Sequence, residues 1–270
     1  MPELPEVETT LRGIEPHLSG QCIRKIIINQ PQLRWPIPDE IMSLQGARIT
    51  ELKRRAKYLL MYTEAGQMIW HLGMSGSMRI LPQQHIQNAH EHVILQLDNR
   101  NSLRFRDPRR FGALLLTRED PLLHPLLVNL GPEPLSDDFN ADYLYQSCQN
   151  RKSAIKNLIM DSHIVVGVGN IYACESLFKS AINPKTRASR LSKQRILRLV
   201  EAIKEILQQA IQQGGTTLQD FTQADGKPGY FSQSLQVYGQ ENQSCPQCER
   251  LIKRFTQGQR STFYCSHCQK

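Results

Sequence analysis

The chain begins Met-Pro-Glu-Leu-Pro-Glu, which places two carboxylates beside a proline at position 2. Removal of Met1 exposes the secondary amine of Pro2, and a terminal amino group has a reference pKa of about 7.7–8.0, against roughly 10.4 for lysine. Part of this amine is therefore neutral at physiological pH. It can displace a leaving group from a sugar C1′, and loss of its N–H proton with ring opening then gives a cationic iminium, an electron sink. Glu3 and Glu6 could serve as proton donor and orienting carboxylate. Alternatively, Pro5 begins a helix and the glutamates only complement its dipole.

Four cysteines near the C-terminus have the spacing of a metal site, two Cys-x-x-Cys pairs separated by sixteen residues. Four thiolates at this spacing can surround one Zn²⁺ tetrahedrally from the two knuckles of a hairpin, which leaves no open position for water and predicts a structural site. The predicted ligands are Cys245, Cys248, Cys265 and Cys268. Between the pairs, Arg260 lies in a predicted hairpin tip and suits a phosphate contact, with a solvated charge as the alternative.

Three further groups of residues are suited to nucleic-acid binding or catalysis. Lys57 precedes an apolar strand and could point into a cleft as an acid or charge partner, or remain a solvated edge lysine. Met74 follows a strand in a glycine-punctuated loop, and Arg109 and Phe111 project from another turn. Exposed apolar and guanidinium groups on loops are what a base-flipping protein needs to fill the gap in the stack. Core packing is the alternative for Met74 and Phe111.

Two other motifs allow phosphate contacts. His90 and His92 stand two residues apart on a predicted strand and hence on one face, where a phosphate contact or a core histidine is favoured over a metal site. The turn Gly167–Asn170 opens a helix whose N–H groups could hold a phosphate, with Lys156 nearby in sequence. A packing turn between two helices is the alternative.

Length and composition indicate a globular protein of two domains that prefers a polyanionic partner. The chain has 270 residues, 40% of them hydrophobic and 21% charged, a net charge of +8 and a pI of about 9.2. No run approaches eighteen apolar residues, so no transmembrane helix is expected. The N-terminus lacks the pattern of a signal peptide, so we expect a cytoplasmic protein.

The elements that must position these residues change character along the chain. A helix is predicted to about His17, and short strands separated by turn signals then predict a β-sandwich or flattened barrel. The strands are predicted at Ile23–Ile28, Tyr58–Tyr62, Gln67–Leu72, Val93–Leu97, Ser102–Arg106 and Gly112–Thr117.

A proline-rich linker is predicted over 119–138, after which the period becomes helical. The clearest helix spans Ser192–Gln213, with a serine that can cap its start and two glycines that stop it. Shorter helices are predicted at Ser153–Asp161 and Asn170–Lys179. The polar, glycine-rich stretch Gly214–Tyr230 could fold over a ligand as a lid.

Taken together, eight motifs in one order resemble the bacterial formamidopyrimidine-DNA glycosylase family. They are PELPEVE, RRAKYLL, HLGMSG, DPRRFG, LGPEPL, VGVGNIYA, GGTTLQDF followed by ADGKPGYF, and the four-cysteine finger with GQRSTFYC. The matches span residues 2 to 268. One departure is AHEHV in place of the more usual KHDHV, which removes a positive charge.

The resemblance implies an α+β multidomain fold with DNA in the cleft between its domains. We expect an N-terminal β-sandwich with an N-terminal helix over 1–132, a helix–two-turn–helix domain over 133–232 and a zinc finger over 236–270. It further implies a monomer, associated with the nucleoid, that excises 8-oxoguanine and formamidopyrimidines from double-stranded DNA and cleaves the strand by β,δ-elimination.

The resemblance also implies residue roles. Pro2 would form the Schiff base, Glu3 would donate and accept protons, Lys57 would act in elimination, and Arg260 would hold the phosphate next to the lesion. The void-filling positions match Met74, Arg109 and Phe111. Phosphate-contacting positions match His90, Arg109, Lys152, Lys156 and Asn170, with the Thr216–Tyr230 loop over the flipped purine.

Two alternatives have different chemistry. An enzyme of the endonuclease VIII type prefers oxidised pyrimidines, and the start PELPEVE, rather than a PEGPE type, argues against it. The other alternative is a non-catalytic zinc-finger DNA-binding protein, and a retained Met1 would favour it, because that residue blocks the amine.

Overall fold

The structure is a computed structural model that describes residues 2–216 and 230–270. By its internal contacts the chain divides into two units, Met1–Asn129 with Gln213–Tyr230, and Leu130–Gln212 with Phe231–Lys270. The break at Asn129 falls inside the predicted linker, while the domain boundaries at 132, 232 and 236 remain predictions. Among the described residues there is no helix with both the length and the apolar character that a membrane span requires.

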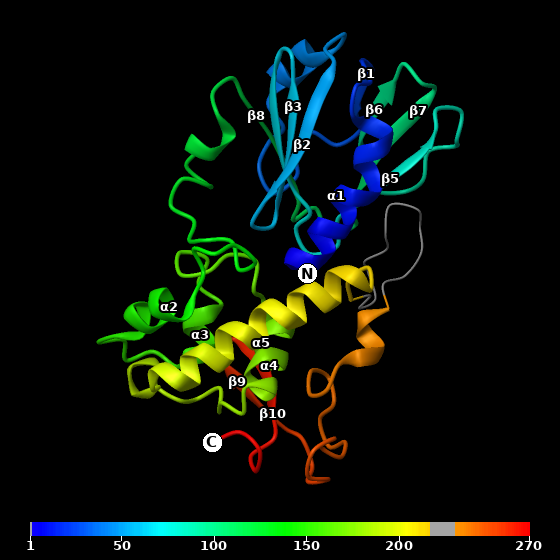
Figure 1. Ribbon diagram of the computed structural model, residues 1–270. Helices are drawn as coiled ribbons and strands as arrows, with labels where there is room; N and C mark the ends of the chain where they lie inside the picture. The colour runs from blue at the N-terminus through cyan, green and yellow to red at the C-terminus, as the bar shows by residue number, and fades with distance from the viewer. Residues whose placement is uncertain (1, 217–229) are drawn as a thin grey trace. The chain divides into compact units, whose positions relative to one another are not determined.

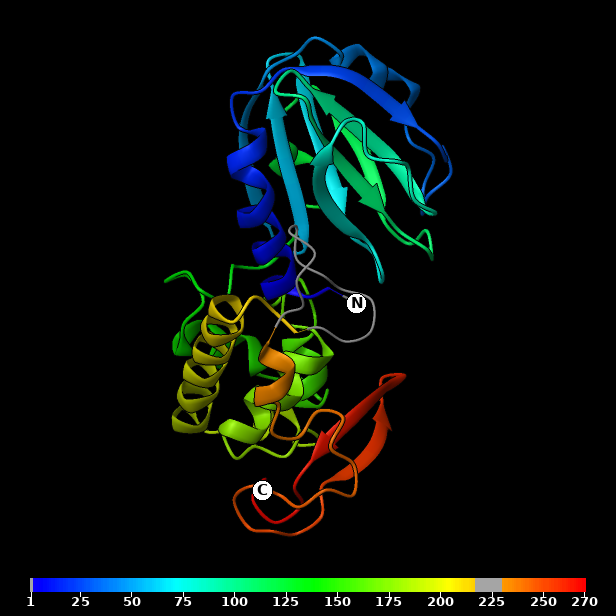
Figure 2. The same cartoon turned by 90° about the vertical axis from the view of Figure 1, so that its right-hand side faces the viewer.

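The first unit is a β-sandwich of two four-stranded antiparallel sheets (Figures 1 and 2). One sheet has the order β1 (Ile23–Ile28), β6 (Glu91–Leu97), β7 (Asn101–Arg106) and β5 (Ser77–Pro82). The other has the order β2 (Ile49–Arg55), β3 (Tyr58–Thr63), β4 (Gly66–His71) and β8 (Ala113–Thr117). Trp70 of β4 and Phe105 of β7 meet across the two layers, with ring centroids 5.6 Å apart. The predicted sandwich is therefore confirmed.

Helix α1 (Leu4–Leu18) closes one side of the sandwich, where it packs against β2 and β5. These are edge strands of the two different sheets, so a single helix covers two otherwise open edges. Its buried aliphatic residues recur every three or four positions, the spacing that puts apolar side chains on one helix face. They are Leu4, Val7, Leu11, Ile14 and Leu18.

Two strands of the sandwich were not predicted, β2 and β5. In β2 only Ile49 and Leu52 are buried, and a register shift between Ile49 and Glu51 breaks the alternation that marks a half-buried strand. The predicted strand Ile23–Ile28 coincides with β1, because its run of β-branched residues pairs along most of its length with β6.

The second unit is helical, with α2 (Ala141–Cys148), α3 (Ile155–Ile159), α4 (Asn170–Lys179) and α5 (Lys193–Gln212). Helix α4 packs against α5 on one side and the C-terminal hairpin on another. Ser192 Oγ accepts the Arg195 N–H at 3.4 Å, so the side chain caps the start of the long helix as predicted. Gly214, with φ of 76°, follows its end.

A small two-stranded hairpin ends the second unit, formed by β9 (Lys253–Gln257) and β10 (Arg260–Tyr264). Its core continues into α4 through Phe178, and Val237 and Phe263 complete the contact. Short 3₁₀ turns occur at Asp39–Leu44, Pro121–Leu123, Ala188–Arg190 and Phe231–Ser234.

Candidate active site and metal centre

The start of the chain is built into the first turn of α1. Pro2 is buried, Glu3 is 3% exposed, and the helix begins at Leu4 rather than Pro5. Glu6 Oε2 accepts the Glu3 N–H at 2.7 Å, and the Glu3 carboxylate accepts the Glu6 N–H in return. This reciprocal capping satisfies two backbone donors of the helix terminus. Both carboxylates therefore have the structural role of a helix cap, and the same bonds fix the backbone that follows Pro2.

The second oxygen of Glu6 reaches a distant part of the chain. Its Oε1 accepts the Thr216 N–H at 2.8 Å. Gly215 permits this approach, since its φ is +80° and an added Cβ would lie 3.1 Å from the same oxygen. The predicted lid Gly214–Tyr230 is thus joined to the start of α1 where it leaves the long helix. Its residues 217–229 lie outside the described residues.

Lys57 stands in the two-residue turn between β2 and β3, directly before the apolar strand that was predicted to follow it. The preceding Ala56 has φ of 55°, a left-handed conformation that non-glycine residues rarely adopt. Arg54 braces this turn, because its Nη1 donates to the Ala56 carbonyl at 3.0 Å while its Nε contacts Glu8 Oε2 at 2.8 Å. Glu8 belongs to α1, so the turn that bears Lys57 is tied to that helix.

His71, the last residue of β4, is held neutral. Burial and then the positive charges of Lys57 and Arg34 lower the pKa of His71 to about 4. A neutral imidazole has one nitrogen able to accept, and His71 Nδ1 accepts the Gly73 N–H at 2.9 Å. The loop that carries Met74 is therefore fixed at its start by an uncharged ring.

Asp107 joins the two loops that were predicted to reach into DNA. Its Oδ1 accepts the Ser75 hydroxyl and its Oδ2 accepts the Gly112 N–H, both at 2.7 Å. The side chain of Asp107 is fully buried. The two backbones touch at Gly73, where an added Cβ would lie only 2.3 Å from the carbonyl carbon of Phe111. The loops thus form one rigid pair.

The predicted void-filling residues come together on this pair of loops. Arg109 and Phe111 are exposed, and the Arg109 guanidinium carbon lies 5.3 Å from the Phe111 ring centroid. Phe111 keeps 46% of its surface exposed, although an aromatic side chain is normally buried. Met74 is half-buried rather than fully exposed as predicted.

His90 and His92 do not share a strand face, because only His92 lies within β6. His90 is exposed, precedes β6 and has φ of 67°, so the prediction that both lie on one strand was wrong. His92 is 8% exposed, and its Nε2 donates to the Asp107 carbonyl at 2.8 Å. His92 is thus a core histidine, whereas His90 remains available to a ligand.

In the helical unit, the predicted phosphate-binding residues separate into surface and interior. Lys152 is exposed before α3. Lys156 is completely buried, and its Nζ donates to Asn170 Oδ1 at 2.6 Å and to Thr262 Oγ1 at 2.7 Å. Asn170 in turn donates to the Ser261 carbonyl at 2.8 Å. Lys156 therefore lies inside the unit, where it joins α3 and α4 to the hairpin, instead of at a surface that meets phosphate.

The four predicted zinc ligands form one cluster, with all four sulfur atoms within 4.8 Å of one another. Tetrahedral Zn²⁺ with Zn–S distances of about 2.3 Å requires sulfur pairs about 3.8 Å apart. Two pairs measure 3.9 Å and 3.5 Å, between Cys245 and Cys268 and between Cys248 and Cys265. The donor set therefore fits one structural zinc ion with no ligand position left over.

Arg260 is the first residue of β10, directly after the two-residue turn of the hairpin. Both turn residues, Gly258 and Gln259, have positive φ, at 56° and 60°. This is the backbone pattern of the tight turns that match strand twist. Arg260 is exposed, so the hairpin presents it next to its tip.

Glu175 holds the segment that leads from the helices to the cysteines. Its carboxylate accepts three successive backbone N–H groups, from Gln236 at 2.9 Å, Val237 at 3.0 Å and Tyr238 at 2.8 Å. Burial raises the pKa of Glu175, against the opposing effect of these three bonds. We call these three bonds the Glu175 clamp. An acidic residue on a buried face of α4 is the only feature of the sequence that could have indicated it.

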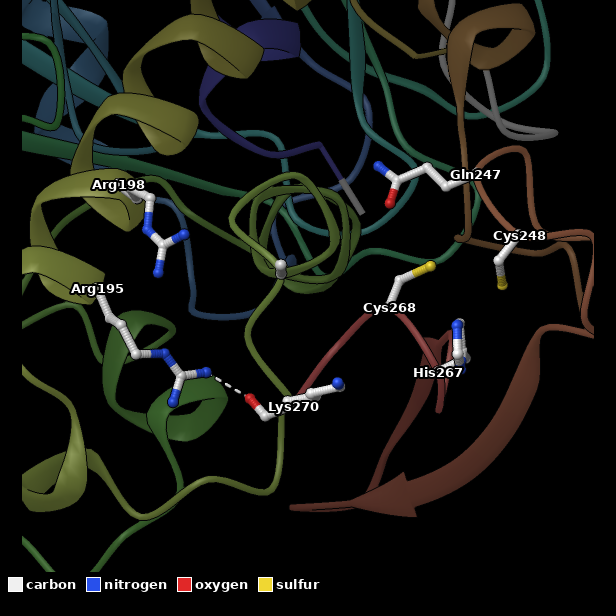
Figure 3. A pocket seen from close by; sticks show the side chains of 8 residues that line it. Arg195, Arg198, Gln247, Cys248, His267, Cys268 and Lys270 are labelled. Carbon is white, nitrogen blue, oxygen red and sulfur yellow. Dashed lines mark hydrogen bonds between the residues drawn. The ribbon is translucent and has the colours of Figure 1, made fainter.

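A basic pocket borders the cysteine cluster within the second unit (Figure 3). Arg195 and Arg198 project into it from α5, and Arg195 donates to the Lys270 carbonyl. Cys248 and Cys268 line the same pocket. A zinc ion with four thiolates carries a net negative charge, which these cations offset.

Models of three families match successive parts of the chain. Residues 1–114 match the formamidopyrimidine-DNA glycosylase N-terminal domain, residues 130–222 the H2TH domain of the same glycosylase, and residues 242–270 the zinc finger found in FPG and IleRS. The three matches follow the order of sandwich, helices and hairpin.

Complete proteins are similar over the whole length. Formamidopyrimidine-DNA glycosylase of Vibrio atlanticus is 55% identical over 269 residues, with all of both chains covered. The crystal structure of the MutM (Fpg) protein of Thermus thermophilus is 38% identical with a TM-score of 0.89, covering 99% of this chain and 98% of that one. Lactococcus lactis Fpg, solved with DNA containing N7-benzyl-Fapy-dG, is 32% identical with a TM-score of 0.92 and full coverage of both chains.

Proposed function

This chain belongs to the formamidopyrimidine-DNA glycosylase family, and we propose that it excises oxidised purines from duplex DNA through a covalent intermediate on Pro2. It is a DNA glycosylase that repairs oxidised bases, with damaged DNA as its partner and one structural zinc. The purine-derived lesion bound by the Lactococcus lactis relative supports 8-oxoguanine and formamidopyrimidines as substrates. Its place of action is nucleoid DNA.

Pro2 is the nucleophile once Met1 has been removed. Its neutral nitrogen attacks C1′, the bond from C1′ to the base breaks, and the base departs with that electron pair and a proton. The nitrogen then loses its own proton, the C1′–O4′ bond opens with protonation of O4′, and the iminium forms. Glu3 is the adjacent carboxyl that gives and takes these protons. Support comes from the reciprocal capping with Glu6, which fixes the backbone beside Pro2.

Strand cleavage follows from the iminium, which makes the C2′ hydrogen acidic. Removal of that proton forms a C2′–C3′ double bond and expels the 3′ phosphate, and a second elimination expels the 5′ phosphate. Lys57 supplies the cationic amine for proton transfer in this phase. Arg260 holds the phosphate beside the lesion through a charge-assisted contact. Water then hydrolyses the iminium and frees Pro2.

The duplex is held by phosphate contacts and opened by the paired loops. Arg109 and Phe111 fill the gap left by the flipped base, with Met74 beside them, which the rigid link through Asp107 supports. The exposed His90 contacts the backbone from the first unit.

In the second unit, Lys152 and Asn170 contact phosphates, and the buried Lys156 orients Asn170. When bound, zinc supplies no chemical step, because its four positions are all taken by sulfur. The metal holds the hairpin from which Arg260 projects.

The observation that carries the proposal is the position of Pro2, directly before the N-cap residue Glu3, whose carboxylate and that of Glu6 are already held in the reciprocal cap. We would incubate the enzyme with an 8-oxoguanine:C duplex and sodium borohydride, then locate the adduct by peptide mass spectrometry. We expect the reduced sugar on the Pro2 nitrogen. Intact mass should show that Met1 is absent.

Pro2→Gly should keep DNA binding but lose most of the trapped product, since it loses the secondary amine. Pro5→Ala is the matched control, because Pro5 lies in the same turn and has no amine to offer. An adduct on another nitrogen, or full trapping by a chain that retains Met1, would refute the mechanism. Faster excision of oxidised pyrimidines would assign the substrates of the endonuclease VIII type instead.

A further inference from the structure

A single guanidinium links α1, the helix that follows the candidate nucleophile Pro2, to the turn that bears the second candidate amine, Lys57. We propose that Arg54, oriented by Glu8, is a positioning residue that sets Lys57 for elimination. This inference rests on the proposed role of Lys57. Arg54 itself touches no reacting atom in the mechanism above.

The geometry fixes the guanidinium on two sides. Nε contacts Glu8 Oε2 at 2.8 Å, and Nη1 donates to the Ala56 carbonyl at 3.0 Å. The side chains of Arg54 and Glu8 are only 12% and 16% exposed. Because the guanidinium is planar, satisfying two acceptors from different elements leaves it little freedom to rotate. Lysine, with one compact ammonium group, cannot reproduce both contacts in this geometry.

The turn itself needs support. Ala56 adopts φ of 55°, which is unfavourable for a residue with a Cβ. The bond to the Ala56 carbonyl is therefore placed where the turn is most strained, one residue before Lys57. Release of that bond lets Ala56 relax toward an ordinary conformation and rotates the peptide that carries Lys57.

The charge environment agrees with a fixed amine. Lys57 lies near enough to His71 that its charge contributes, after burial, to the low pKa of His71. Glu8 is an effective anchor, because Arg54 and then Arg12 lower its pKa despite the opposing effect of burial. Arg12 reaches the other oxygen of Glu8 at 2.8 Å but is 62% exposed and contacts no part of the turn through that bond. It is therefore the natural control.

The test compares Arg54→Gln with Arg12→Gln, using a preformed abasic-site duplex and measuring strand cleavage separately from borohydride trapping. We expect Arg54→Gln to slow cleavage about tenfold while trapping on Pro2 changes little, since a small misplacement of a reacting group is costly. Arg12→Gln should stay within about twofold of the wild type. Glu8→Gln should resemble Arg54→Gln, and Arg54→Lys should fall between.

A double-mutant cycle with Lys57→Ala separates positioning from general stability. If Arg54 acts through Lys57, the double variant Arg54→Gln/Lys57→Ala cleaves no more slowly than Lys57→Ala alone. Additive losses, or an Arg54→Gln variant as active as Arg12→Gln, overturn the inference. Should Arg54→Gln fail to fold, Glu8→Gln takes its place in the cycle.

Failure of the proposed function gives a different result. If Lys57→Ala cleaves at the wild-type rate, the role of Lys57 in elimination is wrong and the inference falls with it. If Lys57→Ala is slow and Arg54→Gln is unaffected, only the positioning role is refuted.

Discussion

Replacement of Gly73 by alanine tests the contact between the two loops that carry the proposed void-filling residues. The new Cβ would lie 2.3 Å from the Phe111 carbonyl carbon and 2.4 Å from the Gly112 nitrogen. Ordinary contact begins near 3.4 Å, so the two backbones must separate by about 1 Å. Neither neighbour is the flexible end of a side chain, and the change cannot be absorbed locally.

Gly20→Ala is the matched control for this substitution. Gly20 has φ of +80°, close to the +65° of Gly73, but nothing lies within 4 Å of its added Cβ. Gly20→Ala should therefore show only the backbone cost, about 1 kcal/mol. Gly73→Ala adds overpacking of about 1–3 kcal/mol, for a total of roughly 2–4 kcal/mol.

The assay is chemical denaturation followed by tryptophan fluorescence. Both tryptophans, Trp35 and Trp70, belong to the first unit, so the signal reports the unit that contains the loops. Excision of 8-oxoguanine should also fall at least about tenfold for Gly73→Ala relative to Gly20→Ala, because the Phe111 backbone is pushed away from Gly73. If the two variants unfold within about 0.5 kcal/mol of each other, the loops are not in backbone contact and the reasoning is refuted.

Three further predictions use other parts of the structure. The pKa of His71 is about 4 in the folded chain, below the 6.5 of the unfolded chain. The neutral His71 side chain therefore makes its full contribution to stability above pH 6.5. That contribution is lost as the pH falls toward 4, and the loss is on the order of 2–3 kcal/mol. His71→Asn keeps an acceptor for Gly73 without this titration, and a pH profile of unfolding free energy as steep as that of the wild type would contradict the assignment. Glu175→Gln turns one acceptor into a donor that faces backbone N–H groups and should cost about 2 kcal/mol; limited proteolysis between 231 and 244 should accelerate, and an unchanged rate would count against the clamp. Zinc chelation or Cys248→Ser should release the metal and weaken DNA binding, since such sites contribute about 10–16 kcal/mol to the fold of a small module. Metal analysis together with a DNA-binding titration tests this prediction. Unchanged DNA affinity in the metal-free protein would exclude the finger from the DNA interface.

Regular elements with strong periodicity were predictable from the sequence. The helix Asn170–Lys179 coincides with α4, and the long amphipathic helix differs by one residue at each end. The strand β2 escaped detection because its bulge removes the alternation on which detection depends. The alternation of the neighbouring residues predicts that His90 belongs to a strand. In the structure His90 has a left-handed backbone, and the strand begins only after it.

Side-chain partners far apart in the chain could not be predicted. Lys156 looked like a surface lysine, but the fold places an acceptor 106 residues away, Thr262, beside its amine. Asp107 occurs in a quoted motif and Glu175 follows one by two residues, yet nothing local indicates that they accept hydrogen bonds from 32 and 61 residues away. The cysteine spacing, by contrast, encodes its own geometry, because four thiols have few other ways to be satisfied around one ion.

The bond between Glu6 and Thr216 has a consequence for how the protein is made. The first unit is assembled from two stretches of chain, and the whole of 130–212 is translated between them. On the ribosome, the sandwich and its helix emerge long before Thr216 exists, so a nascent chain lacks the Thr216 contact that restrains the Glu6 carboxylate. The end of the chain that carries the proposed nucleophile is thus completed late, after the helices that follow it have been synthesised. Chains released before residue 216 lack the contact of Thr216 with Glu6.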